Sequence, residues 1–305
     1  MSFLSLRVLV LTFILLLSCS SPQQKSVVDA EWDKARALDT AAIAQIRITT
    51  PAEYLQVLDT LDQGDLSSLY LAAVLFKNGI ADSLTCDSLF AVYSDFLKRV
   101  SEAYLENNEK AGSDLLNSPS TEKIKKWKIT LASYGIYLDS LNGTYSLKPN
   151  HSILLETFGA NLTSAYRQFL TIVSREENRW TSAEWQSVTT SDSLITTIIT
   201  WENFIHQNPG FIAIKETQQI YAHSLGEFLA GTTHSKVFDP ETYLLNDSSK
   251  VAFESFILKN PKSISAEVVN AYLEMLKTDN FSYSERVDSF LMNKVYSTEL
   301  FVEKN

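Results

Sequence analysis

The stretch WENFIHQNP at residues 201–209 recurs 52 positions later as FESFILKNP at residues 253–261. In both copies aromatic residues anchor a helical pattern, and an Asn-Pro pair then breaks the helix. Tyr221 and Leu225 match Tyr272 and Leu276 at a spacing of 51. Each unit therefore consists of an aromatic-anchored helix, a break and a second helix, which predicts a helical-hairpin repeat.

The same periodicity predicts helices along most of the chain. Thr50, Pro51 and Glu53 have the spacing of a capping box with proline in the first turn. Apolar residues from position 87 to 110 form one long stripe, which is typical of a helix that faces a core. In the C-terminal part we expect helices at 192–207, 211–229, 248–259, 264–278 and 283–294.

A change of period near the middle of the chain predicts a small β-hairpin. Trp127, Ile129 and Leu131 alternate with polar residues, and a second alternating set follows up to Leu147. The pair at 142–143 is Asn-Gly, the strongest short signal for a tight hairpin turn. We expect a hairpin at residues 133–148 that packs on helices, because an isolated hairpin is only marginally stable.

These patterns predict a mainly α fold of layered helical hairpins with one small β-hairpin. The low glycine and proline counts, 9 and 7 in 305 residues, favour long helices. The segments that we expect are a signal peptide at 1–18, a lipidated leash at 19–28, an N-terminal helical layer at 29–118, helices with the hairpin at 119–189, and the repeat region at 190–305.

Two resemblances concern the repeat region. The pattern F-I-x-x-N-P before a Tyr-containing helix resembles the tetratricopeptide-like helical repeats of bacterial envelope lipoproteins. Residues 130–295 are also similar to an uncharacterised group of secreted helical proteins. The period near 51 exceeds the 34 residues of a tetratricopeptide unit. The shared motifs are structural, so the resemblance implies no activity.

The first residues have the order of a bacterial secretory signal. Arg7 precedes an apolar run of about ten residues, too short to cross a bilayer as a helix. The sequence LLSC at residues 16–19 resembles the lipobox of bacterial lipoproteins. That family is cut before the cysteine and acylated on its thiol, so Cys19 is the expected lipidation site and a membrane the expected partner. Ser20 replaces the inner-membrane retention Asp, which favours an outer-membrane address, on the periplasmic or the surface face.

Charge and motif content narrow the function classes. The chain carries 26 Lys and Arg against 36 Asp and Glu, a net charge of −10, with no basic face, so we expect no nucleic-acid partner. No zinc-binding spacing, phosphate loop, calcium loop or serine-nucleophile motif occurs. We therefore expect no metal and no cofactor. Cys86 is interpreted as a small buried residue rather than a nucleophile, because no base is near it in sequence.

Acidic residues near 176–185 leave an enzymatic alternative open. Glu176, Glu177 and Glu184 lie among aromatic residues and are candidates for the acid and base of a cell-wall or glycan hydrolase. The competing interpretation is a solvated helix end with ion pairs. The first hypothesis is instead a non-enzymatic envelope lipoprotein that presents a helical surface to a protein or glycan. A glycan-capture lipoprotein of an outer-membrane transporter is a third idea, but this chain is shorter than that family.

The triplet Asp-Ser/Thr-apolar occurs more often than composition predicts. It resembles the O-glycosylation acceptor of Bacteroidota-type envelope proteins, although Asp and Ser before an apolar run are also typical helix caps. The candidate acceptors are Thr40, Thr60, Ser83, Ser88, Ser140 and Ser193.

Overall fold

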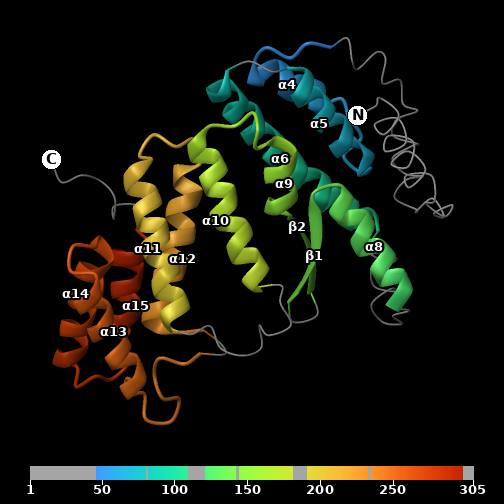
Figure 1. Cartoon of the computed structure of the whole chain (residues 1–305). Helices are drawn as coiled ribbons and strands as arrows, with labels where there is room; N and C mark the ends of the chain where they lie inside the picture. Colours follow the sequence, from blue (N-terminus) through green and yellow to red (C-terminus); the bar gives the residue numbers. More distant parts are fainter. Residues whose placement is uncertain are drawn as a thin grey trace, which may run out of the picture. The chain divides into compact units, whose positions relative to one another are not determined.

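Figure 1 shows the computed structural model of the chain. The structure describes residues 46–79, 82–108, 121–141, 144–180, 191–232 and 235–297. Over these residues the protein is mainly helical with one two-stranded antiparallel hairpin, so the predicted fold class is confirmed. The chain divides between Leu154 and Leu155 into two compact units, called here the N-terminal and the C-terminal unit.

Several sequence-based predictions lie outside the described residues. These include the signal peptide at 1–18, the leash at 19–28 and residues 29–45 of the expected N-terminal helical layer. The segment boundaries predicted after residues 118 and 189 fall in the undescribed stretches 109–120 and 181–190.

The N-terminal unit is built around its longest helix. Its elements in chain order are α4 (Pro51–Leu58), α5 (Ser67–Asn78), α6 (Ser83–Asn107), α8 (Thr121–Ser133), β1 (Ile136–Leu141), β2 (Thr144–Pro149) and α9 (His151–Phe158), which runs across the boundary between the units. Helix α6 packs against α4, α5 and β2. Its apolar stripe is buried as predicted, at Leu89, Tyr93, Phe96, Leu97 and Val100.

The start of α4 follows the predicted capping box. The Glu53 backbone N–H donates to Thr50 Oγ1 at 3.2 Å, and the Glu53 carboxylate accepts the Thr50 backbone N–H at 3.2 Å. These bonds satisfy backbone donors that a helix start leaves open. The buried hydroxyl of Tyr54 then donates to the Ala72 carbonyl at 2.7 Å, which ties α4 to α5.

The predicted hairpin is present and packs on a helix. Strands β1 and β2 pair antiparallel with Leu138 opposite Leu147, and β2 lies against α6. The expected Asn-Gly turn at 142–143 lies outside the described residues. Gly135 enters β1 with φ +75, a conformation that favours glycine, and its carbonyl accepts the Asn150 N–H at 2.7 Å where β2 ends.

One strand signal was wrong. The alternation of Trp127, Ile129 and Leu131 belongs to helix α8, not to the hairpin. Leu131 is buried, whereas Ile129 is exposed, so the three residues do not share one buried face. Three alternating residues are too few to separate a strand from a helix, and the longer helical context decides.

The C-terminal unit is the predicted array of helix pairs. It contains α10 (Ser164–Trp180), α11 (Ser191–Gln207), α12 (Ile214–Ala230), α13 (Asp247–Lys259), α14 (Ile264–Thr278), α15 (Glu285–Phe290) and the π-helical turn η2 (Leu291–Val295). Within this unit, Figure 1 shows α11 and α12 between α10 and the pair α13–α14. The helix expected at 283–294 is present as α15, which begins at Glu285 and continues into the π-helical turn η2 up to Val295.

The two copies of the repeat form matching structures. Helix α11 packs on α12, and α13 packs on α14. After the first helix of each pair, the Asn side chain binds back to the last turn: Asn208 Nδ2 donates to the Phe204 carbonyl at 2.9 Å and Asn260 Nδ2 to the Phe256 carbonyl at 3.0 Å. The sequence repeat is thus also a structural repeat, with the same helix end in both copies.

Aromatic rings fill the core of the helix array. Phe204 lies 5.9 Å from Trp201 and 5.2 Å from Phe211 between ring centroids, and Phe169 of α10 joins this cluster. Between the two pairs, Phe228 of α12 lies 5.1 Å from Phe253 and 5.4 Å from Phe256 of α13. Each fully buried ring contributes roughly 1.5–3 kcal/mol relative to exposure, so these clusters hold the array together.

Candidate binding surface

The acidic residues proposed for hydrolysis do not form a described pair of catalytic carboxylates. Glu176 lies in α10, where its Oε1 accepts the indole N–H of the buried Trp201 at 2.9 Å. That bond joins α10 to α11, a structural role. Glu177 is half-buried in the same helix, and Glu184 lies outside the described residues.

The candidate modification sites occupy different environments. Cys19 and Thr40 lie outside the described residues. Thr60 and Ser83 are exposed, Ser88 and Ser193 are half-buried within helices, and Ser140 is in β1. The Asp82 side chain before Ser83 caps α6 by accepting the Leu84 and Thr85 N–H groups at 3.0 Å. The triplet at 82–84 therefore begins a helix, which is the capping role that its sequence allowed beside glycosylation.

Cys86 is buried in α6, as the sequence suggested. Burial in an apolar core fits a packing residue better than a reactive thiol. Among the described residues, no group of three His, Cys, Asp or Glu side chains is arranged to hold a metal ion.

A buried carboxylate joins the two helix pairs. Glu202 of α11 accepts hydrogen bonds at the start of α14, from Ser263 Oγ at 2.7 Å, the Ile264 N–H at 2.9 Å and the Ser265 N–H at 3.0 Å. The Ser265 hydroxyl also contacts this carboxylate and lies 2.8 Å from the Tyr221 hydroxyl of α12. A helix N-terminus favours negative charge, so Glu202 holds α14 in place.

Tyr221 completes this network from the α12 side. Burial raises the pKa of its hydroxyl, the nearby Glu202 raises it further, and the Ser265 bond opposes the shift. The tyrosine therefore stays protonated at neutral pH. We call the side chains of Glu202, Tyr221, Ser263 and Ser265 the Glu202 clamp.

An unusual backbone arrangement lies where the loops after the two helix pairs meet. Tyr243 in the loop after α12 has φ +58, and Asn280 and Phe281 after α14 have φ +51 and +59. Bulky side chains are rare in this left-handed region, which costs about 1–2 kcal/mol per residue. The conformation therefore has to be imposed by surrounding contacts.

Hydrogen bonds between the two loops supply those contacts. The Tyr283 N–H donates to the Tyr243 carbonyl at 2.7 Å, and the Leu245 N–H donates to the Phe281 carbonyl at 2.8 Å. The Phe238 ring packs edge-on against the Tyr283 ring at 5.2 Å. The two loops thus form one framework.

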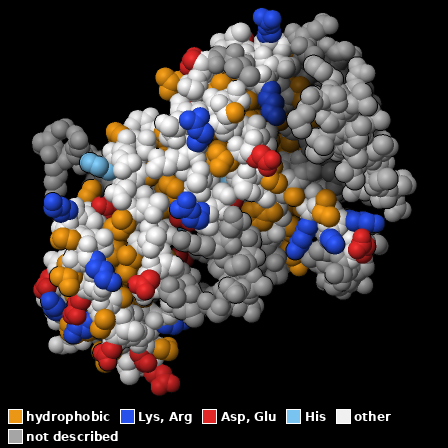
Figure 2. All heavy atoms as spheres, in the orientation of Figure 1, with side chains coloured by type: hydrophobic (Ala, Val, Ile, Leu, Met, Phe, Trp, Pro, Cys, Tyr) orange, Lys and Arg blue, Asp and Glu red, His pale blue; other side chains and the backbone are white. Residues whose placement is uncertain are grey.

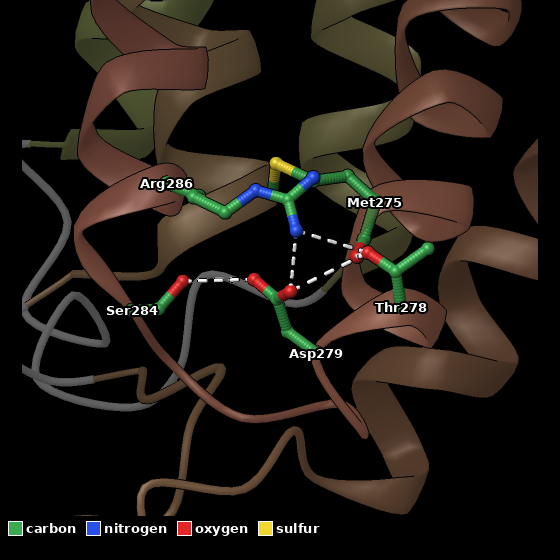
Figure 3. Close-up of polar contacts among 5 residues, drawn as sticks. All are labelled: Met275, Thr278, Asp279, Ser284 and Arg286. Carbon is green, nitrogen blue, oxygen red and sulfur yellow. Dashed lines mark hydrogen bonds and ion pairs between the residues drawn. The ribbon is translucent and has the colours of Figure 1, made fainter.

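A polar cluster fixes the second loop at its base (Figure 3). Asp279, at the end of α14, accepts hydrogen bonds from Ser284 Oγ at 2.9 Å and from the Arg286 guanidinium. Arg286 also donates to Thr278 Oγ1 at 3.1 Å. The cluster closes the connection between α14 and α15, which carries Phe281 and Tyr283.

This framework presents apolar side chains to solvent. Tyr243 is 59% exposed, the neighbouring Leu244 45% and Tyr283 39%. We call these three residues the Tyr243 surface. Large apolar side chains that stay exposed on a fixed backbone are a candidate interaction site.

Carboxylates accompany the Tyr243 surface. Hydrogen bonds from Thr242 and from the Glu241 N–H lower the pKa of Asp239, which therefore stays charged well below neutral pH. The Tyr283 hydroxyl donates to Asp288 at 2.6 Å, which raises the pKa of that tyrosine. Figure 2 shows acidic and hydrophobic side chains next to one another at the lower end of the C-terminal unit.

This arrangement is suited to contact rather than to covalent chemistry. Tyrosine supplies a large apolar ring and a polar tip. Charged groups of both signs lie beside it, because Lys250 is over the Phe281 ring and Arg286 binds Asp279. Sequence reasoning missed this surface. The residues 239–243 read Asp-Pro-Glu-Thr-Tyr, a turn signal, but nothing in them predicts a left-handed tyrosine.

No known protein family matches the chain, and neither the curated proteins nor the solved structures compared with it show a significant similarity. In the described part of the chain, no helix combines the length and the apolar character needed to cross a membrane.

Proposed function

We propose that this chain is a membrane-anchored bacterial envelope lipoprotein that acts as a non-enzymatic binding protein for a protein partner. The observation that carries the proposal is the Tyr243 surface, in which exposed apolar side chains stand on a backbone held in a costly conformation. Strained backbone that persists in a folded protein is concentrated at functional sites.

One feature of this surface favours a protein over a glycan, and a second favours tight binding of either. The tyrosine and leucine side chains of the Tyr243 surface would fill apolar pockets of a partner protein. Tyrosine is also enriched among the residues that dominate binding energy in protein interfaces. The two hydrogen-bonded loops also reduce the entropy lost on binding, because their backbone is already ordered.

The anchoring part of the proposal rests on the first residues. The lipobox-like sequence at 16–19 ends a signal of the right length. Each buried methylene of an acyl chain contributes about 0.8 kcal/mol, and more than one chain makes attachment long-lived. A lipid on Cys19 would therefore tether the protein, and we propose the outer membrane as its location.

The test places a photo-reactive benzoyl-phenylalanine at Tyr243 in the full chain, expressed in the cell that makes it. Irradiation of intact envelopes should link this position to one protein. The same amino acid at Leu84, which is 72% exposed on α6, should give no such product. A Cys19→Ala variant should lose both the acyl mass and the crosslink. Adducts to glycan, or equal products at both positions, would contradict the proposal.

A further inference from the structure

Helix α8 of the N-terminal unit is basic, in contrast to the acidic chain that contains it. The whole sequence has a net charge of −10, but α8 contains four lysines and one acidic residue, Glu122, which gives this helix a net charge of +3. Lys125, Lys126 and Lys128 are exposed, and none of the three forms an ion pair within the described part of the chain. Their positive charge therefore faces solvent and is available to an anionic partner.

An exposed apolar side chain lies among these lysines. Ile129 is 49% exposed and lies three positions after Lys126 and four after Lys125, so the three side chains share one side of α8. A different side of the helix packs inward: Leu131 is buried, Trp127 four positions before it is half-buried, and α8 contacts β1. Figure 2 shows Lys and Arg side chains grouped with hydrophobic ones where α8 lies.

From this arrangement we infer that the exposed side chains of α8 bind the surface of a bilayer that contains anionic phospholipids. We call Lys125, Lys126, Lys128 and Ile129 the α8 surface. At a bilayer, the lysine ammonium groups meet the phosphates, while the lysine stems and the isoleucine lie at the boundary between headgroups and acyl chains. Each lysine near an anionic membrane strengthens binding about fivefold. A soluble polyanion would use the charges alone and leave Ile129 in water.

The position of α8 in the chain favours a membrane over an acidic protein. Helix α8 belongs to the unit that follows the expected lipidation site. Cys19 lies 27 positions before Ile46, the first described residue, and a chain of that length spans at most about 90 Å. A lipid on Cys19 would therefore keep this unit near the headgroups, where a weak contact is occupied because its effective concentration is high. This step rests on the proposed anchor, whereas the charge and exposure of α8 do not.

The experiment places the photo-reactive benzoyl-phenylalanine at Ile129 in the full chain, where it keeps a large apolar side chain. The purified protein is mixed with vesicles of phosphatidylcholine alone or of equal parts phosphatidylcholine and phosphatidylglycerol, and is then irradiated. Peptide mass spectrometry measures the lipid adduct. We expect an adduct at 129 whose yield is about tenfold or more higher on the anionic vesicles. Leu84, 72% exposed in the same unit, is the control position and should give little adduct on either vesicle.

Two sets of substitutions test whether the α8 lysines carry the binding. Changing the three lysines of the α8 surface to glutamine should lower the adduct yield at 129 by about tenfold or more on anionic vesicles. Glutamine has nearly the helix propensity of lysine, so thermal unfolding should stay unchanged. The control makes the same change in net charge at three exposed lysines of the C-terminal unit and should leave the yield as it is. These are Lys215, Lys259 and Lys262.

Each other outcome overturns the inference. These outcomes are a lipid adduct at 129 no larger than at the Leu84 control, equal yields on the two kinds of vesicle, and a yield that the α8 substitutions leave unchanged or that the control substitutions lower equally. In intact envelopes, an adduct at 129 to a protein instead of a lipid would also overturn it. The acyl mass on Cys19 and the crosslink at Tyr243 are measured separately, so failure here is distinct from failure of the proposed function.

Discussion

The carboxylate of Glu202 accepts the backbone N–H of Ser265 at 3.0 Å, across 63 positions of sequence. This bond crosses from the first helix pair of the repeat to the second. Neighbouring repeats usually hold together through apolar packing, and here a buried charge adds a directional contact. The orientation of α14 on α11 is therefore fixed by hydrogen bonds as well as by the aromatic cores.

Loss of the Tyr221 hydroxyl should weaken the Glu202 clamp without breaking it. In Tyr221→Phe the ring still fills its site, and Ser265 keeps its contact with Glu202. We expect the free energy of unfolding to fall by about 1 kcal/mol, the size of one net hydrogen bond. Urea titration followed by circular dichroism measures it. An unchanged midpoint would mean that the Tyr221 bond adds nothing.

The backbone strain at Tyr243 should be visible in the stabilities of two variants that carry a small residue at this position. Tyr243→Gly relieves the left-handed conformation, whereas Tyr243→Ala keeps it, so the glycine variant should be more stable by about 1 kcal/mol. At the adjacent Leu244, which has no positive φ, the same pair should show the opposite order. The thermal unfolding temperatures of the four variants test this prediction. An alanine variant that is more stable than the glycine variant at both positions would contradict strain at Tyr243.

Gly226 on α12 should tolerate a side chain only when Tyr296 is shortened. A Cβ at Gly226 would lie 2.7 Å from Tyr296 Cζ, closer than carbon atoms approach. In a Tyr296→Ala background, Gly226→Ala should stabilise the protein by about 1 kcal/mol through helix propensity. In the wild-type background that gain should vanish. A double-mutant cycle measures the coupling, and additive effects would show that the ring moves away freely.

His223 should titrate above its ordinary range. The hydrogen bond to Glu227, with Nε2 and Oε1 3.4 Å apart, is the main cause that raises its pKa, while partial burial opposes the shift. Because the folded-state pKa exceeds the unfolded value of about 6.5, the pair stabilises the fold at pH below that value. That stability is lost as the pH rises through the raised pKa.

The stability effect at His223 should be small, about 0.3 kcal/mol, because the imidazole is largely exposed. Titration of its ring protons by NMR is therefore the better measurement. In Glu227→Gln the pKa should fall toward the ordinary value. If the pKa of His223 is the same in Glu227→Gln as in the wild type, the shift has another cause.

The parts of this fold that sequence predicts are those set by local chemistry. The Thr50 capping box and the Asn208 and Asn260 helix ends involve partners within four residues, so their spacing reveals them. The strand signal at Trp127 failed because a short alternating run fits a helix as well.

The candidate sites depend on distant partners instead. The left-handed conformation of Tyr243 is held by the Tyr283 N–H, 40 positions away, and no local rule favours a tyrosine there. Glu202 and Glu254 have similar neighbours in sequence but differ in burial, because only Glu202 meets the start of a following helix. Repeat sequences therefore predict the helix pair and leave open which end of the array is covered.

The most direct test of this account compares two identical substitutions in chemical denaturation. Glu202→Ala should lower the free energy of unfolding by about 3 kcal/mol, because it leaves the donors at Ser263, Ile264 and the buried Ser265 without their acceptor. Glu254→Ala removes the same side chain from the equivalent position and should change stability by less than about 0.5 kcal/mol. Equal losses in the two variants, or no loss in Glu202→Ala, would contradict a clamp between the repeats and an open counterpart on α13.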